Sequence, residues 1–254
     1  MRLRPAQVSS GWRLESFEAL GSTNDECRAR AAEGDPGRLW IVAAEQSAGR
    51  GRLGRSWVSP RGNLHASVLL IDPAPPDRAP ELGFVAGVAL IDALREVTGA
   101  GPRLQLKWPN DVLLDGGKLS GLLLESSTLP RGGLACVAGF GVNCVAHPSG
   151  LPYPARDLRE FGVTREDVLA ALAAALEGWL AVWSRGTDFA RIRTAWLDRA
   201  AGLGGEIEVT QGERRQRGRF LDIDARGRLR LATVSGEILL DAGDVFLPPA
   251  RGRE

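Results

Sequence analysis

The spacing of hydrophobic positions changes character near residue 204. Before it, apolar runs typical of buried strands alternate with longer segments of helical periodicity. Strands are expected at 14–20, 39–46, 63–71, 103–108, 112–125 and 134–143, and helices at 23–34, 81–99, 164–183 and 188–200. After it, polar and apolar residues alternate with period two between turns at 211–213, 225–227 and 235–237. We therefore predict an α+β fold, with a mixed β-sheet flanked by helices in residues 1–203 and a small β-barrel in residues 204–254.

Two short signals predict where elements begin and turn. Thr23-x-x-Glu26 and Thr164-x-x-Asp167 have the spacing of a capping box, so a helix is predicted to begin at each threonine. The Gly-Gly pair at 116–117, between two apolar runs, predicts a hairpin turn. The first helix start and the hairpin lie beside the residues that carry the candidate chemistry.

Composition excludes several classes of protein. The chain has 254 residues, 44% of them hydrophobic and 25% charged, which is ordinary for a soluble globular protein. Its formal net charge of +1 means that any affinity for phosphate or nucleic acid must be local. Three cysteines without a CxxC spacing and only two histidines disfavour a disulfide framework and a zinc site. Neither a signal peptide nor a membrane span is apparent, so we expect a cytoplasmic protein.

Lysine is almost absent from the chain, and its two occurrences lie close together. Of the 32 basic residues only Lys107 and Lys118 are lysine, and both fall within residues 107–121. A lysine ammonium is a compact, mobile charge that can follow a moving phosphate or carboxylate, unlike the planar arginine fork. A solvated surface lysine is the ordinary alternative, but the clustering makes this segment the first place to look for chemistry.

A loop rich in glycine and arginine precedes the lysine segment. Residues 46–71 contain no acidic side chain but four arginines, at positions 50, 52, 55 and 61. Glycines at 49, 51 and 54 let backbone amides approach an anion closely, and guanidinium groups can bind carboxylate or phosphate oxygens in pairs. From the residues alone, an anion-binding loop and a nonspecific RNA contact are both open.

The sequence Trp108-Pro109-Asn110-Asp111 predicts a turn at the end of a strand. Proline disfavours helical geometry at the residue before it, so the turn displays an amide and a carboxylate side by side. Such a pair suits Mg²⁺, which binds one or two protein oxygens and completes its coordination with phosphate and water. The alternative, favoured for this segment taken alone, is that Asn110 and Asp111 hydrogen-bond within their own turn.

Other polar residues are candidates with an equally plain structural alternative. Ser22, Thr23 and Asn24 could cap a helix or line a pocket for a neutral polar ligand. Asn143 could read a purine or simply end a strand, and only two glycines precede it, so a dinucleotide fingerprint is weak. His65 lies among apolar residues and is interpreted as a satisfied structural histidine. No serine or cysteine has the neighbours of a covalent nucleophile.

Four motifs, in this order and spacing, resemble those of biotin protein ligases: GSTNDE at 21–26, EQSAGRGRLGRSW at 45–57, KWPNDVLLDGGKLSGLLLE at 107–125 and GFGVN at 139–143. The small β-domain from about residue 205 matches the SH3-like carboxyl-terminal domain of that family, so the resemblance covers nearly the whole chain. The related lipoate ligases lack KWPND in this form. Because the first strand is expected almost at residue 12, the resemblance is to monofunctional ligases without an N-terminal winged helix, and DNA repression is not implied.

The resemblance implies an ATP-dependent ligase. Biotin and ATP would give biotinyl-5′-AMP and pyrophosphate, and a lysine of a biotin carboxyl carrier domain, from acetyl-CoA carboxylase or a related carboxylase, would then displace AMP. Biotin is expected to contact Ser22, Thr23, Asn24, Gln46, Arg50, Gly51, Arg52 and Lys118. ATP is expected to contact Arg50, Arg52, Arg55, Trp57, Lys107, Asn110, Asp111, Lys118 and Asn143.

Two residues carry the catalytic roles that the resemblance implies. Lys118 is expected at the biotin carboxylate and α-phosphate, and Arg52 in a loop that closes over both. Asn110 and Asp111 are the expected Mg²⁺ ligands. Neither DNA nor a membrane is expected as a partner, and a homodimer is left open. A lipoate or octanoate ligase of the same fold is the first alternative. An RNA-binding module is the second, disfavoured by the absence of aromatic residues in 47–56 and by the small net charge.

Overall fold

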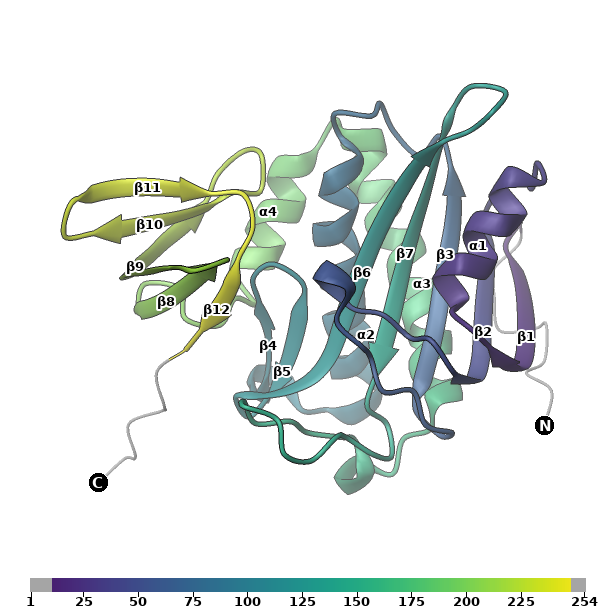
Figure 1. The fold of residues 1–254 in the computed structure, drawn as a ribbon, viewed down its shortest axis with the longest axis horizontal. Coiled ribbons are helices and arrows are strands. Elements are labelled where there is room, and N and C mark those ends of the chain that lie inside the picture. Colours follow the sequence, from purple (N-terminus) through teal and green to yellow (C-terminus); the bar gives the residue numbers. More distant parts are fainter. Residues whose placement is uncertain (1–10, 248–254) are drawn as a thin grey trace.

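The structure is a computed structural model that describes residues 11–247. It contains a sheet of seven strands and a sheet of five, with the smaller sheet set to one side of the larger (Figure 1). The helices are α1 (Thr23–Ala32), α2 (Leu82–Thr98), α3 (Arg165–Trp183) and α4 (Phe189–Leu197). The predicted α+β class is confirmed. Residues 1–10 and 248–254, which the predicted domain ranges include, lie outside the described residues.

The larger sheet is mixed, as predicted. Its strands are β1 (Arg13–Leu20), β2 (Leu39–Gln46), β3 (Leu64–Ile71), β4 (Leu104–Lys107), β5 (Asp111–Leu114), β6 (Gly117–Thr128) and β7 (Leu134–Val142). They lie in the order β1-β2-β3-β7-β6-β5-β4. β1 and β2 are parallel because α1 returns the chain between them, and every other neighbouring pair is antiparallel.

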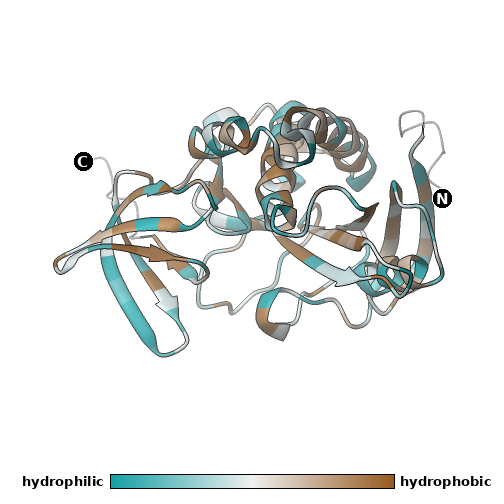
Figure 2. Cartoon of the chain, turned by 90° about the horizontal axis from the view of Figure 1, so that it is seen from above, coloured by the Kyte–Doolittle hydropathy of each residue, from teal (hydrophilic) through white to brown (hydrophobic). Residues whose placement is uncertain are grey.

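Alternating side chains of the central strands face opposite sides of this sheet. In β3, Leu64 and Val68 belong to a large core shared with α2 and α3. Leu69 faces the other way, into a smaller cluster with Cys27 of α1. The view from above shows helices gathered on one side of the larger sheet (Figure 2). One face is therefore deeply buried, and the other is covered only in part by α1, which leaves room for a site beside that helix.

Within residues 11–247, α3 together with the short turn that follows it (Arg165–Gly186) is the one helix long and apolar enough to cross a membrane. Val168, Leu172 and Leu176 lie in the large core. Thr164 and Asp167 form the predicted capping box at its start. These contacts are those of a core helix.

The smaller sheet is antiparallel throughout. Its strands are β8 (Glu206–Gln211), β9 (Arg214–Ile223), β10 (Leu229–Thr233), β11 (Gly236–Leu240) and β12 (Asp244–Phe246), in the order β11-β10-β9-β8-β12. Val209 and Phe220 are buried in the same continuous core as the larger sheet. The Trp108 indole N–H donates to Gly227 O at 3.1 Å. The two sheets are thus packed together rather than joined only by a linker.

The first helix begins at Thr23, as predicted, but the residue that caps it differs from the predicted one. Ser22 Oγ accepts from the Asp25 amide at 3.4 Å and caps α1, so the predicted capping box of Thr23 and Glu26 is wrong. Ser22 has extended backbone geometry, as a cap residue requires, whereas Thr23 is already helical. The shift frees the Thr23 side chain to point toward Gln46.

The hairpin between β5 and β6 turns at Asp115–Gly116, so the predicted Gly-Gly turn is wrong. Both residues have positive φ, 48° and 75°, which is the geometry of a primed hairpin turn. Gly117 is already paired with Leu114 in the ladder. Aspartate tolerates the left-handed region better than most residues, so Asp-Gly rather than Gly-Gly forms the turn.

Candidate functional site

One row of side chains crosses the larger sheet on the face that carries α1. Strand pairing joins one residue from each of the seven strands: Phe17, Ala43, His65, Gly141, Gly121, Asp111 and Lys107. Residues paired across neighbouring strands point to the same face of a sheet. The row therefore brings the glycines of 139–143 and the lysine segment 107–121 onto one surface.

Gly121 of β6 and Gly139 and Gly141 of β7 form a flat surface on this face, which we call the glycine floor. A Cβ at Gly141 would lie 2.4 Å from the Trp57 ring, and one at Gly139 would lie 2.2 Å from Asn24 Oδ1. Gly121, paired with Gly141, would place a Cβ 3.2 Å from the same ring. The first two distances are too short for real side-chain contacts. Trp57 and Asn24 therefore lie directly on the backbone of β7, which only glycine allows.

Uncharged hydrogen-bonding groups gather at the start of α1. Gln46, the last residue of β2, accepts at Oε1 from the backbone amide and the hydroxyl of Thr23, at 2.8 and 3.1 Å. Its Nε2 donates to Ser59 Oγ at 2.9 Å. Ser67 Oγ of β3 lies 2.7 Å from Thr23 Oγ1. Of the predicted biotin-binding residues, Ser22, Thr23 and Gln46 are thus brought together as one neutral wall.

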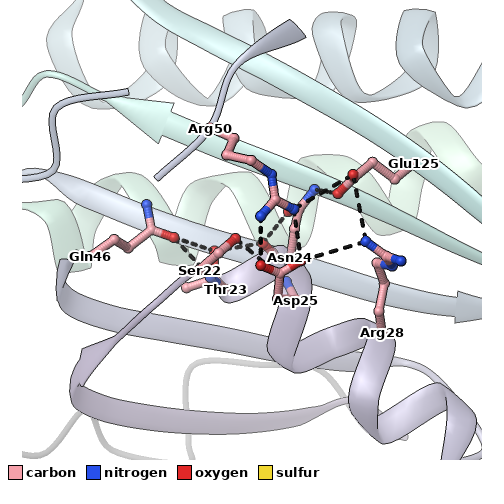
Figure 3. A network of polar contacts seen from close by, with 9 residues as sticks. Ser22, Thr23, Asn24, Asp25, Arg28, Gln46, Arg50 and Glu125 are labelled. Carbon is pink, nitrogen blue, oxygen red and sulfur yellow. Dashed lines mark hydrogen bonds and ion pairs between the residues drawn. The ribbon is translucent and has the colours of Figure 1, made fainter. Parts of the chain in front are cut away.

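The side-chain amide of Asn24 is fully engaged within the protein (Figure 3). Its Nδ2 donates to Glu125 Oε2 at 2.7 Å and to Leu123 O at 3.3 Å, and its Oδ1 accepts from Ser67 Oγ at 2.6 Å. Each donor and acceptor of the amide is therefore oriented by a protein partner. Asn24 orders this end of the site, and a direct contact with a ligand stays a prediction.

Arg50 is the first arginine of the loop that also contains Arg52 and Arg55 (the arginine loop), and its side chain binds α1. Its guanidinium donates to both oxygens of Asp25, at 2.6 and 2.7 Å, and lies 3.7 Å from Glu125. Figure 3 shows Arg28 beside the same two carboxylates, 3.5 Å from Asp25 and 4.0 Å from Glu125. Hydrogen bonding to Arg50 is the main cause that lowers the pKa of Asp25. The charge of Arg50 is thus already matched, and it anchors the loop to the helix.

A β-bulge places Lys118 on the site face. β5 and β6 pair regularly as far as Val112 with Ser120, but the next pair is Leu113 with Lys118, so the register shifts. In a regular ladder Lys118 would pair with Leu114, whose side chain lies in the large core. The extra residue redirects the lysine to the opposite face, which is a common use of bulges beside functional sites.

Asp111 holds both lysines of the chain. Lys118 Nζ lies 2.8 Å from one carboxylate oxygen, and Lys107 Nζ lies 3.0 Å from the other. Burial alone would raise the pKa of Asp111, but the two ammonium groups outweigh it and keep that pKa below its ordinary value. Two cations share one carboxylate, so this end of the site carries excess positive charge.

Two aromatic rings flank the Lys118 ammonium. Its Nζ lies 5.6 Å from the centroid of Trp57 and 5.9 Å from that of Tyr153. No motif of the sequence points to Tyr153. It is brought here by main-chain pairing, in which the Lys118 amide donates to Pro154 O at 2.8 Å and the Arg156 amide donates to Lys118 O at 3.0 Å. Such a contact depends on the folded chain, so no local signal could have revealed it.

Arg52 is a half-buried cation with weak partners. It donates to Asn110 Oδ1 and to Gly243 O, both at 3.3 Å. Burial is the main cause that lowers its pKa. Within residues 11–247 no carboxylate forms an ion pair with it, in contrast to Arg50. A desolvated guanidinium without a counterion favours the binding of an anionic ligand.

The smaller sheet contributes to this end of the site, which the sequence did not predict. Arg55 forms an ion pair with Asp244 at 2.8 Å, and Lys107 Nζ lies 3.4 Å from Val245 O. The Gly51 amide donates to Arg55 O at 2.7 Å and closes the loop on itself. The start of β12 therefore supports both the arginine loop and one of the lysines.

Two family models match the chain. The biotin/lipoate A/B protein ligase family matches residues 21–143, and the biotin protein ligase C-terminal domain matches residues 202–247. A biotin--[acetyl-CoA-carboxylase] ligase of Paracoccus denitrificans is 42% identical over 89% of this chain and 96% of that protein. The chain belongs to the biotin protein ligase family. A Mycobacterium tuberculosis protein of the same name is 33% identical over 94% of this chain and 90% of its own.

A solved structure of the family shares the whole fold. Biotin protein ligase from Aquifex aeolicus in complex with biotin and ATP superimposes with a TM-score of 0.78, at 27% identity, over 93% of this chain and 98% of that one. A Bacillus subtilis relative, 28% identical and covered over 74% of its length, is named a bifunctional ligase/repressor. Some of these relatives are thus named as ligases alone, and others as ligases that are also repressors.

The predicted magnesium ligands of this family member are both engaged with protein groups. Asn110 Nδ2 donates to Leu122 O at 2.5 Å, and its Oδ1 accepts from Arg52. Each oxygen of Asp111 faces a lysine. No group of three His, Cys, Asp or Glu side chains suited to a metal occurs within the described part of the chain. A magnesium ion here would displace a lysine or reach the protein through phosphate oxygens, so the ligand role stays a prediction.

Asn143 and His65 each have a buried polar atom without a hydrogen-bond partner among the described residues. Asn143 Nδ2 donates to Arg156 O at 3.1 Å, but its Oδ1 has no partner in the part of the chain that the structure describes. His65 Nε2 lies 3.1 Å from Pro60 O, while its Nδ1 is also without a partner. The interpretation of His65 as a fully satisfied structural histidine is therefore wrong. Buried polar atoms without partners are uncommon and often belong to ligand sites, which supports the contact with ATP predicted for Asn143.

Proposed function

We propose that this site forms biotinyl-5′-AMP from biotin and ATP and transfers the biotin to a lysine of a biotin carboxyl carrier domain. The division of the site carries the proposal. A neutral hydrogen-bonding wall at Thr23 and Gln46 is joined by the glycine floor to the cations Lys107, Lys118 and Arg52. Biotin has a neutral cyclic urea at one end and a carboxylate at the other, and ATP adds further negative charge beside that carboxylate.

In the first half-reaction a biotin carboxylate oxygen attacks the α-phosphorus of ATP. The new bond is an acyl phosphate, and the bond to pyrophosphate breaks with its electrons leaving on the pyrophosphate oxygen. Both reactants are anions, so most of the catalytic task is to hold them together and stabilise the charge that builds on the α-phosphate. Lys118 is suited to this because its resting partner, Asp111, lies on the same face and the ammonium can turn toward the phosphate.

In the second half-reaction the amine of the carrier lysine attacks the acyl carbon. An amide bond forms, the amine loses a proton, and AMP leaves with the electrons of the acyl–oxygen bond. Arg52 and Lys118 can remain with the phosphate through this step, since neither needs to lose its proton. Arg50, Arg55 and Arg61 are each paired with a carboxylate, so the arginine loop does not offer the free basic patch that an RNA contact would use.

Magnesium, when bound, would neutralise part of the charge of the triphosphate. Asn110 and Asp111 remain the proposed protein groups near it, through phosphate oxygens or water. The names of the relatives support a carboxylase as the source of the carrier domain. A cytoplasmic location and a homodimer are further proposals, and sedimentation would measure the second directly.

The direct test is ATP-dependent transfer of labelled biotin to an isolated carrier domain, with unlabelled lipoate and octanoate as competitors. We expect label on the carrier only when ATP is present, and no competition from either fatty acid. A parallel reaction supplies labelled lipoate without biotin, and transfer of lipoate but not of biotin would assign the chain to the other branch of the matched family. If the carrier is labelled by neither biotin nor lipoate, the ligase function is rejected.

A further inference from the structure

His65 occupies a position in the site that its hydrogen bonds do not explain. It lies in the middle of the row that crosses the sheet, paired with Ala43 on one side and Gly141 on the other. Its side chain is 1% exposed. Because Pro60 O can only accept, the proton of the neutral ring is on Nε2, and Nδ1 is left as a lone-pair acceptor without a partner among residues 11–247.

Trp57 presents the complementary group on the neighbouring glycine. Its Nε1 lies 2.5 Å from the position of a Cβ at Gly141, and this buried N–H also lacks a partner in the described part of the chain. Side chains that are directly opposite on paired strands have Cβ positions about 5 Å apart. The two orphaned atoms, one donor and one acceptor, are therefore within the reach of a small movement of the indole.

The glycine floor permits that movement. Neither Gly121 nor Gly141 has a side chain to hold the ring in one place, so the indole can slide across the backbone of β6 and β7. Leaving a buried donor and a buried acceptor unpaired is unfavourable, and joining them removes both penalties at once. Burial lowers the pKa of His65, so the neutral, accepting form of the ring is the one present at neutral pH.

We propose that His65 is a positioning residue for Trp57: in the biotin-bound site, His65 Nδ1 accepts the Trp57 indole N–H and fixes the ring over Gly121 and Gly141. The fixed ring forms a wall beside Lys118, whose ammonium it already faces. This inference rests on the proposed function, because it assigns the ordered state to the biotin complex.

Two substitutions separate this role from a structural one. In His65→Asn the side-chain oxygen takes the place of Nδ1, so the acceptor for Trp57 is kept while the donor to Pro60 is lost. In His65→Gln the side-chain amide nitrogen takes the place of Nε2, so the bond to Pro60 is kept while the acceptor for Trp57 is lost. The readouts are biotin affinity by calorimetry and the Trp57 indole N–H resonance in ¹⁵N-labelled protein, assigned by its absence in Trp57→Phe.

We expect biotin to move the indole resonance downfield in the wild type and in His65→Asn but not in His65→Gln, whose biotin Kd rises about fivefold. The opposite order, or two variants that both behave as the wild type, would overturn the proposal. If both variants lose biotin affinity, the double variant His65→Gln/Trp57→Phe decides. It should bind biotin as weakly as Trp57→Phe alone. If His65→Gln lowers the affinity of Trp57→Phe as much as that of the wild type, the coupling between the two residues is rejected. Absence of biotin binding by the wild type would instead reject the proposed function.

Discussion

The two ends of the site meet their hydrogen-bonding and charge requirements in opposite ways. At the start of α1, Thr23, Asn24 and Gln46 bond to protein partners, and Arg50 is matched by Asp25. At the other end, two lysines share one carboxylate, and Arg52 has no carboxylate partner among residues 11–247. The polar groups of the first end are thus already paired with protein groups, and we expect this end to bind the neutral ring of biotin. The second end carries excess positive charge, and we expect an anionic ligand to balance it.

The ends also differ in how the chain assembles them. The neutral end comes mainly from α1, β2 and β3, which lie close together in the sequence; β2 and β3 are paired in the sheet, and α1 covers the same face. The charged end joins the arginine loop, the β5–β6 hairpin and the start of β12 in the smaller sheet. A change in any one of these three distant segments can disturb it. Substitutions at the two ends should therefore fail in different ways, which the following experiments can separate.

The largest effect is expected at Lys118. Lys118→Ala should slow biotin-dependent exchange of pyrophosphate into ATP about a hundredfold, on the order of 3 kcal/mol, because it removes a cation placed for the transition state. Lys118→Arg should also be impaired, since the planar fork does not replace a mobile ammonium. Because Asp111 loses one of its two partners, the thermal midpoint should fall somewhat, and a cooperative unfolding transition well above the assay temperature serves as the control for folding. Wild-type exchange in Lys118→Ala would remove this residue from the mechanism.

The next largest effect, on biotin affinity rather than on reaction rate, is expected at Gly139. In Gly139→Ala the new methyl group would meet Asn24 Oδ1, so Asn24 must move and the order of the neutral end is lost. Biotin affinity should fall about thirtyfold, roughly 2 kcal/mol, while the exchange rate at saturating biotin changes little. Gly178→Ala is the matched control, because nothing lies within 4 Å of a Cβ there and alanine favours its helix. Equal affinity in the two variants would show that Asn24 does not order the site.

Asp111→Asn should weaken the charged end without changing its shape. Two ammonium groups would then face a neutral amide, and we expect about a tenfold loss of exchange rate together with lower stability. The pKa of Asp111 is lowered in the fold, so its stabilising contribution is present above its ordinary value and is lost as pH falls through the lowered one. Urea unfolding should show a constant difference from the wild type between about pH 5 and 8, shrinking below about pH 4. A difference that grows on acidification would contradict this assignment.

Some of the site could be predicted from the sequence, and the parts that could not have physical reasons. The clustering of two lysines and the glycine-rich strand end pointed to the correct face because each lies in one short segment. The capping residue and the hairpin turn were misplaced by one residue, since neighbouring residues there carry nearly equal signals. Tyr153 and Asp244 gave no signal at all. They reach the site only through main-chain pairing with Lys118 and through packing of the smaller sheet, which no local pattern encodes.

The smallest effect is expected at the contact between the arginine loop and the smaller sheet. The Arg55–Asp244 pair is exposed, so Asp244→Asn should lower stability by less than about 1 kcal/mol. It should nevertheless raise the rate of protease cleavage within 50–56 about threefold in the absence of biotin and ATP, because the loop loses one of its few tethers. High salt should reproduce the effect in the wild type and abolish the difference between the proteins. Identical cleavage at low salt would show that β12 does not restrain the loop.

The division of the site between a neutral and a charged end is tested most directly by comparing biotin with its methyl ester, which lacks the carboxylate. Calorimetric Kd values for both ligands are measured in the wild type, Thr23→Val and Lys118→Ala. Thr23→Val should weaken both ligands about tenfold and keep the preference for biotin, because it removes a hydroxyl from the neutral wall. Lys118→Ala should lose that preference while binding the ester as the wild type does. If Thr23→Val loses the preference, or if Lys118→Ala keeps it, the two ends do not have separate tasks and the account is wrong.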